Sequence, residues 1–566
     1  MGDDVALAGR FDATSRVSDS VDRFVAFLEK DRLPILGIFL YVLAVALFRD
    51  ISEYFLLDQA FVTGSHPWIY SIAHHVAFYI LTFLGLVFLL SAFSQRDTRK
   101  CMNFVASFFW VIILPPYLDH FLFGLNENYA YFSPTDFLNY LLHFSGSSFH
   151  PGQAAEIIAV VLALFGYTIW TQREHLGTVG ERLVALLRIA LLGVSALMAL
   201  FFMATPGAYL PVGSTGGVPD FPNFDALRYY QYHLFIFAYY VVLGLVLGFA
   251  LLFFSRREAF RRIASSMRPA QTVFFLGVVT AGIAMGWMAS GGTRYVTNIL
   301  QEPYWVNAEF VVLALCSAFM AWQVSTMWND LSDRATDSPH KPGRVLAAGV
   351  FNSGTYAQAS IVLAISAVLI AGLLSIYHAL MLLVILALSY IYSMRPFRFK
   401  EHLLSPALIG LGTSLAFIFG FLTPYTVMVE LPYTIGIDVL PSAEVAFPAL
   451  TISGLLAAIY AFLGLVVGSM VTDVDGYAED VRGGVKTIYT ALGLDRGVMV
   501  VSTLIFVASL TTLFMFNGQW DLVVFPVLGV AATAAFYKYR SSRPVLIIAM
   551  IGFAYAAVRF MQILPH

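Results

Sequence analysis

The chain has 566 residues, of which 59% are hydrophobic and only 12% are charged. A soluble domain carries about 25% charged residues, so much of this apolar surface must face lipid. The net charge of −3 gives no case for nucleic-acid binding, and two cysteines are too few for a disulfide framework or a cysteine metal site. We therefore expect an all-α protein that crosses the membrane many times and has membrane lipid as its solvent.

Apolar segments of the length that crosses a bilayer, roughly 20 residues, recur along the whole chain. They predict about fifteen transmembrane helices. Six lie in the first half, at Pro34–Phe48, Ile69–Phe93, Phe104–Phe123, Ala154–Thr171, Ile189–Met203 and Tyr232–Phe254. Nine follow, at Thr272–Ala289, Phe310–Trp328, Ala357–Ile376, Ala379–Tyr392, Leu404–Tyr425, Ala449–Val471, Val498–Phe516, Leu522–Phe536 and Val545–Met561. The outer loop from Gly124 to Pro151 is rich in Tyr and Phe, which suggests an interfacial helix around Phe137–Phe144.

The basic residues indicate how these spans are oriented. If the N-terminus is cytoplasmic and the spans alternate, 28 of the 32 Lys and Arg lie in inner segments, as the positive-inside rule requires. The exceptions are Arg49, Arg228, Arg294 and Arg559. We expect the plasma membrane of a prokaryote, with the inner loops in the cytoplasm. The basic segment Ser255–Pro269 is the natural boundary between a six-span membrane domain, residues 1–268, and a nine-span domain, residues 269–566.

The inner loop after the eighth span carries a spaced set of oxygen ligands. Asn329, Asp333 and Asp337 follow one another at intervals of four, so they share one face of a continuing helix. Stacked carboxylates repel one another, and a divalent cation would relieve that repulsion. Oxygen ligands favour Mg²⁺, which binds through a few carboxylates and the phosphates of a substrate. The neighbouring candidates are Asp330 as a further ligand and Lys341 and Arg344 as phosphate-binding cations.

The inner loop after the twelfth span repeats this chemistry. Asp473, Asp475 and Asp480 leave the membrane and are followed by Arg482 and Lys486. Two such loops on the cytoplasmic side could hold two Mg²⁺ ions around one diphosphate. The alternative is that both are ordinary solvated loops, because charged residues are common at a membrane surface.

These residues resemble the UbiA superfamily of intramembrane prenyltransferases, over about Pro269 to His566. The first family motif, NxxxDxxxD, corresponds to Asn329, Asp333 and Asp337 after the second span of this half. The runs that resemble the other signatures are His340–Gly349, Tyr392–Lys400 and Gly484–Thr487, the last at the end of the second acidic motif. One position departs from the family: the second motif is of the DxxxD type, and its first acid is replaced by Gly476.

The resemblance implies a nine-helix bundle that uses Mg²⁺ to transfer a prenyl group from an isoprenyl diphosphate to a lipophilic or aromatic acceptor. Its catalytic residues would be Asp333, Asp337 and Asp480. Substrate would be bound by Asn329, Lys341, Arg344, Tyr392, Arg398, Lys400, Arg482 and Lys486. The metal ligands would be Asn329, Asp330, Asp333, Asp337, Asp473, Asp475 and Asp480. The alternative from another class is a non-catalytic transporter or assembly protein on the same scaffold, which Gly476 favours and the intact first motif opposes.

The N-terminal half carries a second group of ionisable residues, near the outer ends of its spans. Its members are His66, His74, His75, Asp119, His120, His143, His150, Glu156 and His233. Imidazoles with carboxylates suit Zn²⁺, Cu²⁺ or Fe²⁺, which predicts a separate outer metal site with His75, His120 and Glu156 as the leading candidates. The alternative is that these histidines lie at the interface, hydrogen-bonded to backbone and headgroups, since no HxH or HxxxH spacing occurs.

Overall fold

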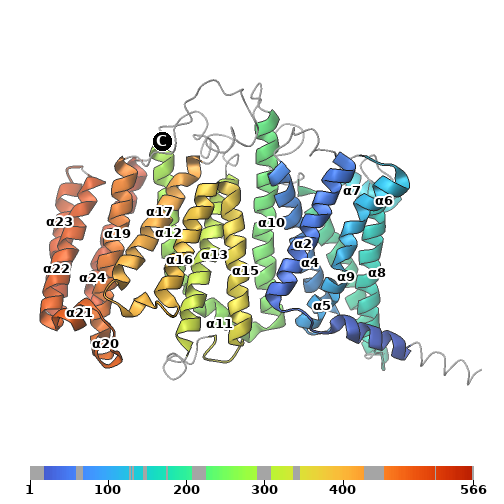
Figure 1. The fold of residues 1–566 in the computed structure, drawn as a ribbon, viewed down its shortest axis with the longest axis horizontal. Coiled ribbons are helices and arrows are strands. Elements are labelled where there is room, and N and C mark those ends of the chain that lie inside the picture. Colours follow the sequence, from blue (N-terminus) through green and yellow to red (C-terminus); the bar gives the residue numbers. More distant parts are fainter. Residues whose placement is uncertain are drawn as a thin grey trace, which may run out of the picture. The chain divides into compact units, whose positions relative to one another are not determined.

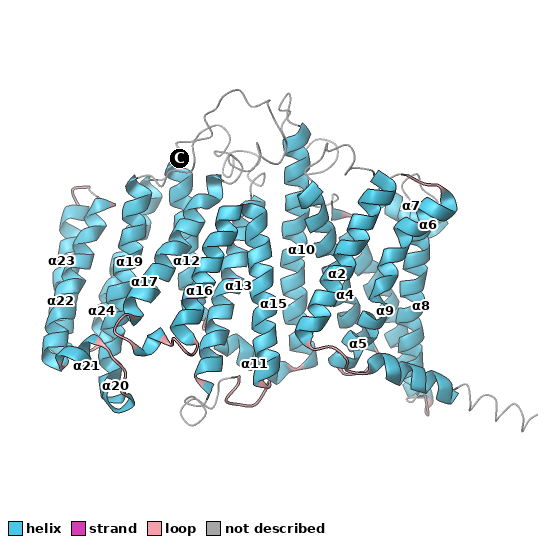
Figure 2. Ribbon diagram, viewed as in Figure 1, coloured by secondary structure: helices cyan, strands magenta, loops and turns pink. Residues whose placement is uncertain are grey.

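The computed structural model describes most of the chain, with gaps. The described residues are 18–58, 68–126, 129, 133–143, 150–173, 176–206, 225–289, 308–334, 345–425, 452–516 and 518–563. Within these ranges every regular element is a helix (Figure 2). Fourteen of the described helices are long and apolar enough to cross a membrane. The chain is therefore an integral, multi-pass, all-α membrane protein.

The contacts divide the chain into two compact units, Met1–Ile263 and Ala264–His566. The first unit holds six of the fourteen candidate spans and the second holds eight. The fifteenth predicted span falls on the last helix, Ser542–Ile563, which is not among these fourteen candidates.

The helices of the first unit follow residues 18–29, which are also helical. They are α2 (Ile35–Glu53) with the π-turn η1 (Tyr54–Asp58), α4 (Trp68–Phe93), α5 (Thr98–Phe108), η2 (Phe109–Ile113), α6 (Leu114–Phe123), α7 (Pro134–His143), α8 (Pro151–Gln172), α9 (Val179–Ala204), α10 (Asp225–Ser255) and α11 (Arg257–Ser266), which runs into the second unit. α7 is the short helix expected in the aromatic loop. α5, η2 and α6 together form the single span Thr98–Phe123.

The helices of the second unit are shown in Figure 1. They are α12 (Pro269–Ala289), α13 (Ala308–Ser332), α15 (Ser353–Leu374), α16 (Ile376–Ser393), η6 (Phe399–Glu401), α17 (Ser405–Leu422), η7 (Thr423–Tyr425), α19 (Ile452–Asp473), η8 (Val474–Gly476), α20 (Tyr477–Gly483), α21 (Ile488–Leu492), α22 (Leu494–Thr511), η9 (Thr512–Phe514), α23 (Asp521–Tyr539) and α24 (Ser542–Ile563). The turn containing η6 and the segment containing η8 and α20 lie at the same end of this bundle.

Glycines allow α12 and α17 to pack backbone against backbone. A Cβ added at Gly282 would lie 2.1 Å from the carbonyl oxygen of Phe417, and one at Gly286 would lie 2.1 Å from that of Phe421. The contact is reciprocal, because a Cβ at Gly420 would lie 2.1 Å from the carbonyl oxygen of Val279. Lipid provides no hydrophobic force between helices, so close packing through small residues is what holds such a pair together.

A buried aspartate joins the last two helices of the second unit. Asp521 at the start of α23 is fully buried, and its Oδ1 accepts hydrogen bonds from Arg559 Nε at 2.8 Å and from the Tyr555 hydroxyl at 2.7 Å. Its Oδ2 accepts a second bond from Arg559, at 2.9 Å. The paired contacts of a guanidinium with a carboxylate fix the register of α24 against α23.

Candidate active site

The first acidic motif meets two cations from the turn after α16. Asn329 and Asp333 lie one helical turn apart at the end of α13, and Asp333 N donates to Asn329 O at 3.0 Å. Lys400 Nζ donates to Asn329 Oδ1 at 3.1 Å and forms an ion pair with Asp333. Arg398 Nη2 lies 3.2 Å from the same Asp333 oxygen. Two of the predicted metal ligands, Asn329 and Asp333, therefore lie together with two of the predicted phosphate-binding residues, Arg398 and Lys400.

The backbone around η6 directs both cations towards Asp333. Arg398 has φ +43°, a left-handed conformation that a residue other than glycine rarely adopts. Its Nε lies 2.7 Å from Glu401 Oε1, which holds the side chain in place. Burial lowers the pKa of Lys400, and the hydrogen bond and charge of Asp333 oppose this shift without cancelling it. A carboxylate or phosphate near Lys400 favours its charged form.

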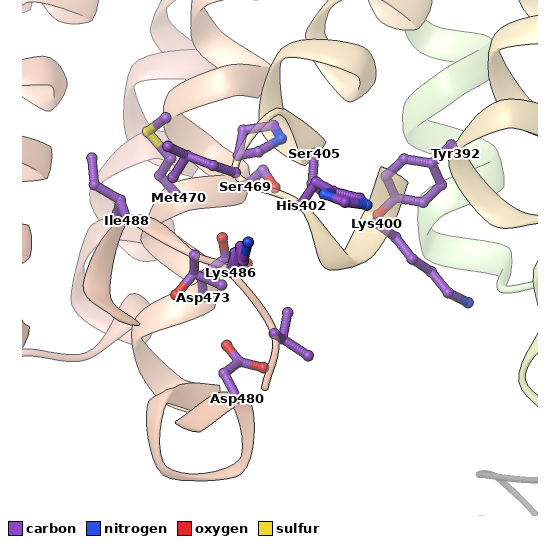
Figure 3. A pocket seen from close by; sticks show the side chains of 14 residues that line it. Tyr392, Lys400, His402, Ser405, Ser469, Met470, Asp473, Asp480, Lys486 and Ile488 are labelled. Carbon is purple, nitrogen blue, oxygen red and sulfur yellow. The ribbon is translucent and has the colours of Figure 1, made fainter. Parts of the chain in front are cut away.

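The second acidic motif folds back on itself beside a cavity. α19 ends at Asp473, η8 turns the chain, and α20 ends at Gly483 and is followed by Gly484, whose φ of +70° favours glycine. Val485 N then donates to Asp480 O at 3.0 Å, which returns the chain towards the bundle. Asp473, Asp480 and Lys486 thereby line a cavity of about 130 Å³ (Figure 3).

Lys400 belongs to both halves of the site. It lines the cavity together with Tyr392 and the residues of the second motif. Figure 3 shows its side chain extending away from Asp473 and Asp480, and its Nζ contacts Asn329 and Asp333. The two loops are also joined by their main chains, because Lys486 N donates to Glu401 O at 3.0 Å.

Three of the predicted site residues have other contacts. Asp330 is buried and pairs with Arg268, whose Nη2 lies 3.0 Å from its Oδ1. Asp475 accepts hydrogen bonds from the backbone nitrogen of Ser542, at 3.2 Å, and from the Ser542 hydroxyl, which places it at the start of α24. Arg482 is exposed, donates to the carbonyl of Ala478 at 3.1 Å and does not line the cavity. Three more predicted residues, Asp337, Lys341 and Arg344, lie outside the described residues.

Several cavity residues were not predicted from the sequence. The polar ones are His402, Ser405, Ser469 and Thr487, and the apolar ones include Leu403, Pro406, Met470 and Ile488. His402 and Ser405 directly follow the Tyr392–Lys400 signature, so their position in the chain was the available signal. Ser469 lies one helical turn before Asp473 on α19, and nothing in its local sequence marks it as part of a site.

Gly476 leaves space beside the carboxylate of Asp480. A Cβ added at this position would lie 3.8 Å from Asp480 Oδ2 and 4.0 Å from its Oδ1, which is ordinary contact distance. An acid at position 476, as in the family that this half resembles, would therefore lie next to Asp480. In this chain Asp473 is the described acid that lines the cavity together with Asp480.

Comparison with known proteins agrees with these motifs. The sequence pattern of the UbiA prenyltransferase family matches residues 299–546. No curated protein matches the chain. Similar solved structures include one of digeranylgeranylglyceryl phosphate synthase in membranes, at 15% identity and a TM-score of 0.39 over 54% of this chain and 96% of that one.

Two further similar structures are of a UbiA homologue from Archaeoglobus fulgidus. One, bound to DMAPP and Mg²⁺, has 18% identity and a TM-score of 0.36 over 54% of this chain and 100% of that one. The other, bound to Cd²⁺, has 19% identity and a TM-score of 0.34 over 52% and 97%. The family match and the ordered motifs of the second unit lead to one conclusion: residues 299–546 are a UbiA prenyltransferase family domain.

Proposed function

We propose that the C-terminal half catalyses Mg²⁺-dependent transfer of a prenyl group from an isoprenyl diphosphate to a lipophilic or aromatic acceptor within the membrane. Membership of the UbiA prenyltransferase family supports prenyl transfer as the general chemistry. The observation that carries the proposal is the position of Lys400. Its Nζ contacts Asn329 and Asp333, while its side chain lines the cavity of Asp473 and Asp480. One diphosphate beside Lys400 would therefore be within reach of both acidic motifs.

The donor set suits a hard divalent cation. Asn329, Asp333, Asp473 and Asp480 offer only oxygen atoms, and magnesium prefers oxygen ligands and is commonly shared with substrate phosphates. We assign Asp337, which continues the spacing of the first motif, to the same set. When bound there, Mg²⁺ would neutralise charge on the departing diphosphate.

The basic residues of the two loops would bind the diphosphate oxygens. Arg398 and Lys400 now neutralise Asp333, so they are positioned to exchange that carboxylate for a phosphate. Lys486 would bind from the opposite wall of the cavity, and we assign Lys341, Arg344 and Arg482 to the same role. These cations would stabilise the negative charge that develops on diphosphate when the allylic C–O bond breaks and the electron pair leaves with it. The acceptor then forms a bond to the allylic carbon and loses a proton.

Two predicted metal ligands fit structural roles better. Asp330 is neutralised by Arg268 in a buried ion pair. Asp475 accepts from the first residue of α24, where a carboxylate satisfies a free N–H and interacts favourably with the helix dipole. We propose that both residues hold helices in place, and that the second motif binds metal through Asp473 and Asp480.

The apolar residues that line the cavity support the proposal that the allylic end of the substrate lies beside them. Leu403, Pro406, Met470 and Ile488 line the same cavity as the polar groups. An allylic carbon beside them would be shielded from water, which otherwise would capture the cation. Tyr392, which also lines the cavity, would present its ring to that cation.

We further propose that residues 269–566 form a nine-span transferase domain and residues 1–268 a separate six-span domain. The acidic loops and the N-terminus would face the cytoplasm of a prokaryote, across its plasma membrane. The distribution of Lys and Arg supports this orientation.

Turnover of isoprenyl diphosphates by the purified chain tests the proposed function. The assay measures diphosphate release and lipid-soluble prenylated product, with a membrane lipid extract as the source of acceptor. Asp333→Ala should lower turnover on the order of 100-fold or more, and EDTA should abolish it until Mg²⁺ is restored. Asp495→Ala is the matched control, since Asp495 is an exposed aspartate that pairs with Arg540 outside the site. Full turnover by Asp333→Ala, or in excess EDTA, would contradict the proposal.

A further inference from the structure

A group of charged side chains is buried in the first unit, remote in sequence from the transferase motifs. Arg49 and Glu53 on α2 are each 3% exposed and Asp50 is fully buried. All three lie in the candidate span Ile35–Leu57, and they meet His75 in the candidate span Ile72–Phe93. Ionisable groups at membrane depth are costly, so they mark a functional site unless their charges are fully compensated.

Asp50, Glu53 and His75 bring three metal-binding groups together. One donor atom from each lies within 4.8 Å of the donors of the other two. His75 Nδ1 is 2.7 Å from Asp50 Oδ1. The second oxygen of Asp50, Oδ2, is buried and has no hydrogen-bond partner among the described residues. A carboxylate oxygen left without a donor at 0% exposure is expensive, and a cation beside it would remove that cost.

Arg49 compensates only part of the group. It is ion-paired with Glu53, whereas Asp50 contacts His75. Glu156 of α8, a leading candidate from the sequence, is not one of the three residues whose donor atoms lie together. A divalent cation between Asp50, Glu53 and His75 would compensate the buried carboxylates further.

The surrounding contacts hold Glu53 in position without using all of its lone pairs. Its Oε2 pairs with Arg49, and its Oε1 accepts from Tyr129 N at 3.1 Å. Tyr129 is itself fixed by a 2.5 Å hydrogen bond from its hydroxyl to Asp119, which also accepts from Gly152 N at 2.7 Å. Ligating carboxylates in metal sites are typically held by such outer hydrogen bonds. The Arg49 guanidinium additionally lies over the ring of Tyr129, 4.8 Å from its centroid.

Two further imidazoles lie next to this group. The His74 ring centroid is 4.0 Å from that of His75, and His74 Nδ1 lies 3.1 Å from His233 Nδ1 of α10. Two imidazole nitrogens approach this closely when one donates to the other or when both face a cation. Nitrogen donors beside carboxylates distinguish this group from the all-oxygen ligands of the second unit.

We infer that Asp50, Glu53 and His75 bind one divalent first-row transition-metal ion in the first unit. Imidazole with carboxylate suits Zn²⁺, Fe²⁺, Co²⁺ or Ni²⁺ better than Mg²⁺ or Ca²⁺. Arg49 limits the charge of the site and orients Glu53, while His74 packs against His75 and contacts His233 outside the group of three ligands. His120, a leading candidate from the sequence, is partly exposed, contacts Asn126 at 3.1 Å and is not in the group.

Metal analysis of the full chain tests this inference directly. The protein is purified in detergent without a polyhistidine tag or chelator and is then titrated with Zn²⁺ or Co²⁺ after mild stripping. We expect close to one ion per chain in the purified or reconstituted protein. Bound Co²⁺ should give the visible absorption of a site with nitrogen and oxygen ligands. Added Mg²⁺ in large excess should not displace the ion, which separates this site from the one proposed for diphosphate.

Variants assign the ion to these residues. Asp50→Asn and His75→Gln should each lower the affinity for Co²⁺ at least about 10-fold, while His120→Gln, the matched control, should leave it unchanged. His75→Cys keeps a ligand and should add a thiolate-to-cobalt absorption band, which a merely structural role for His75 would not produce. Wild-type protein that binds neither Zn²⁺ nor Co²⁺ would overturn the inference. So would a full stoichiometry in Asp50→Asn and His75→Gln, or the absence of the new band in folded His75→Cys.

Discussion

Asp473 and Asp475 are chemically identical and two positions apart, yet they have different surroundings. Asp473 ends α19 and lines the cavity with Asp480, whereas Asp475 lies in the 3₁₀ turn η8 and contacts Ser542. Two positions along the chain rotate a side chain by roughly 200° in an α-helix and 240° in a 3₁₀ turn, so Asp475 points away from the face that Asp473 occupies in either case. The sequence indicated an acidic loop beside a membrane exit, but the contact between Asp475 and Ser542 exists only in the folded bundle, so both residues were predicted as metal ligands.

Substitution of these two aspartates should separate catalysis from stability. Asp473→Asn should lower prenyl-transfer turnover on the order of 100-fold with little effect on unfolding, because it removes a charge from the cavity. Asp475→Asn should retain turnover and lower the stability of the fold by about 1 kcal/mol, through a weaker cap on α24. Turnover and thermal unfolding in detergent are measured on the same preparations. A severe loss of turnover in Asp475→Asn, with Asp473→Asn unaffected, would show that the two roles are assigned the wrong way round.

At the scale of the helices, apolar length predicted where the spans lie but not how each begins. The span predicted at Phe104–Phe123 starts earlier, at Thr98, although its first turn carries Arg99 and Lys100. Asp97 explains the difference, because its side chain accepts from Arg99 N at 2.8 Å and caps a polar first turn that hydropathy alone discounts. Within this span the helix restarts at Leu114, with Pro115 and Pro116 in its first turn, a signal that apolar length alone does not take into account.

The glycine contact between α12 and α17 should be sensitive to a single methyl group. Gly420→Ala places a Cβ 2.1 Å from the carbonyl oxygen of Val279, so the two helices must separate. We expect a loss of stability of about 1–3 kcal/mol, measured as a lower unfolding temperature in detergent. Gly412→Ala, on the same helix, is the matched control, because a Cβ there meets nothing within 4 Å and should be neutral or slightly stabilising. Equal effects of the two substitutions would mean that the close approach does not support the fold.

For the whole molecule, ion pairs account for two of the four basic residues that do not fit the positive-inside pattern. Arg49 pairs with Glu53 within α2, and Arg559 pairs with Asp521 across α24 and α23. A neutralised pair carries little weight in orienting a chain, so these two residues do not oppose the predicted orientation. The basic residues on each side of the membrane could be counted from the sequence, but their ion-pair partners could not be identified. A pair of distant residues such as Asp521 and Arg559 exists only in the folded bundle.

Cysteine labelling in sealed vesicles tests the orientation of the second unit. In a chain whose native Cys101 and Cys316 are replaced by serine, Glu479→Cys should react with an impermeant thiol reagent only from the cytoplasmic side. Trp520→Cys should react only from outside, since it precedes α23 at the other end of the bundle (Figure 1). Glu479 and Trp520 are both exposed, so accessibility does not limit the reaction. Labelling of both positions from the same side would contradict the predicted arrangement of spans.

The gap between the two loops of the second unit is set by the main chain. The bond between Lys486 N and Glu401 O uses atoms that every residue except proline possesses at the donor position. Of these two residues only Lys486 lines the cavity, so its side chain could be exchanged, and the charge of the cavity changed, without loss of this main-chain bond. The bond between Lys486 N and Glu401 O would thus let the affinity for a ligand change during evolution while the distance between the two loops, and so the size of the ligand that fits between them, stayed the same.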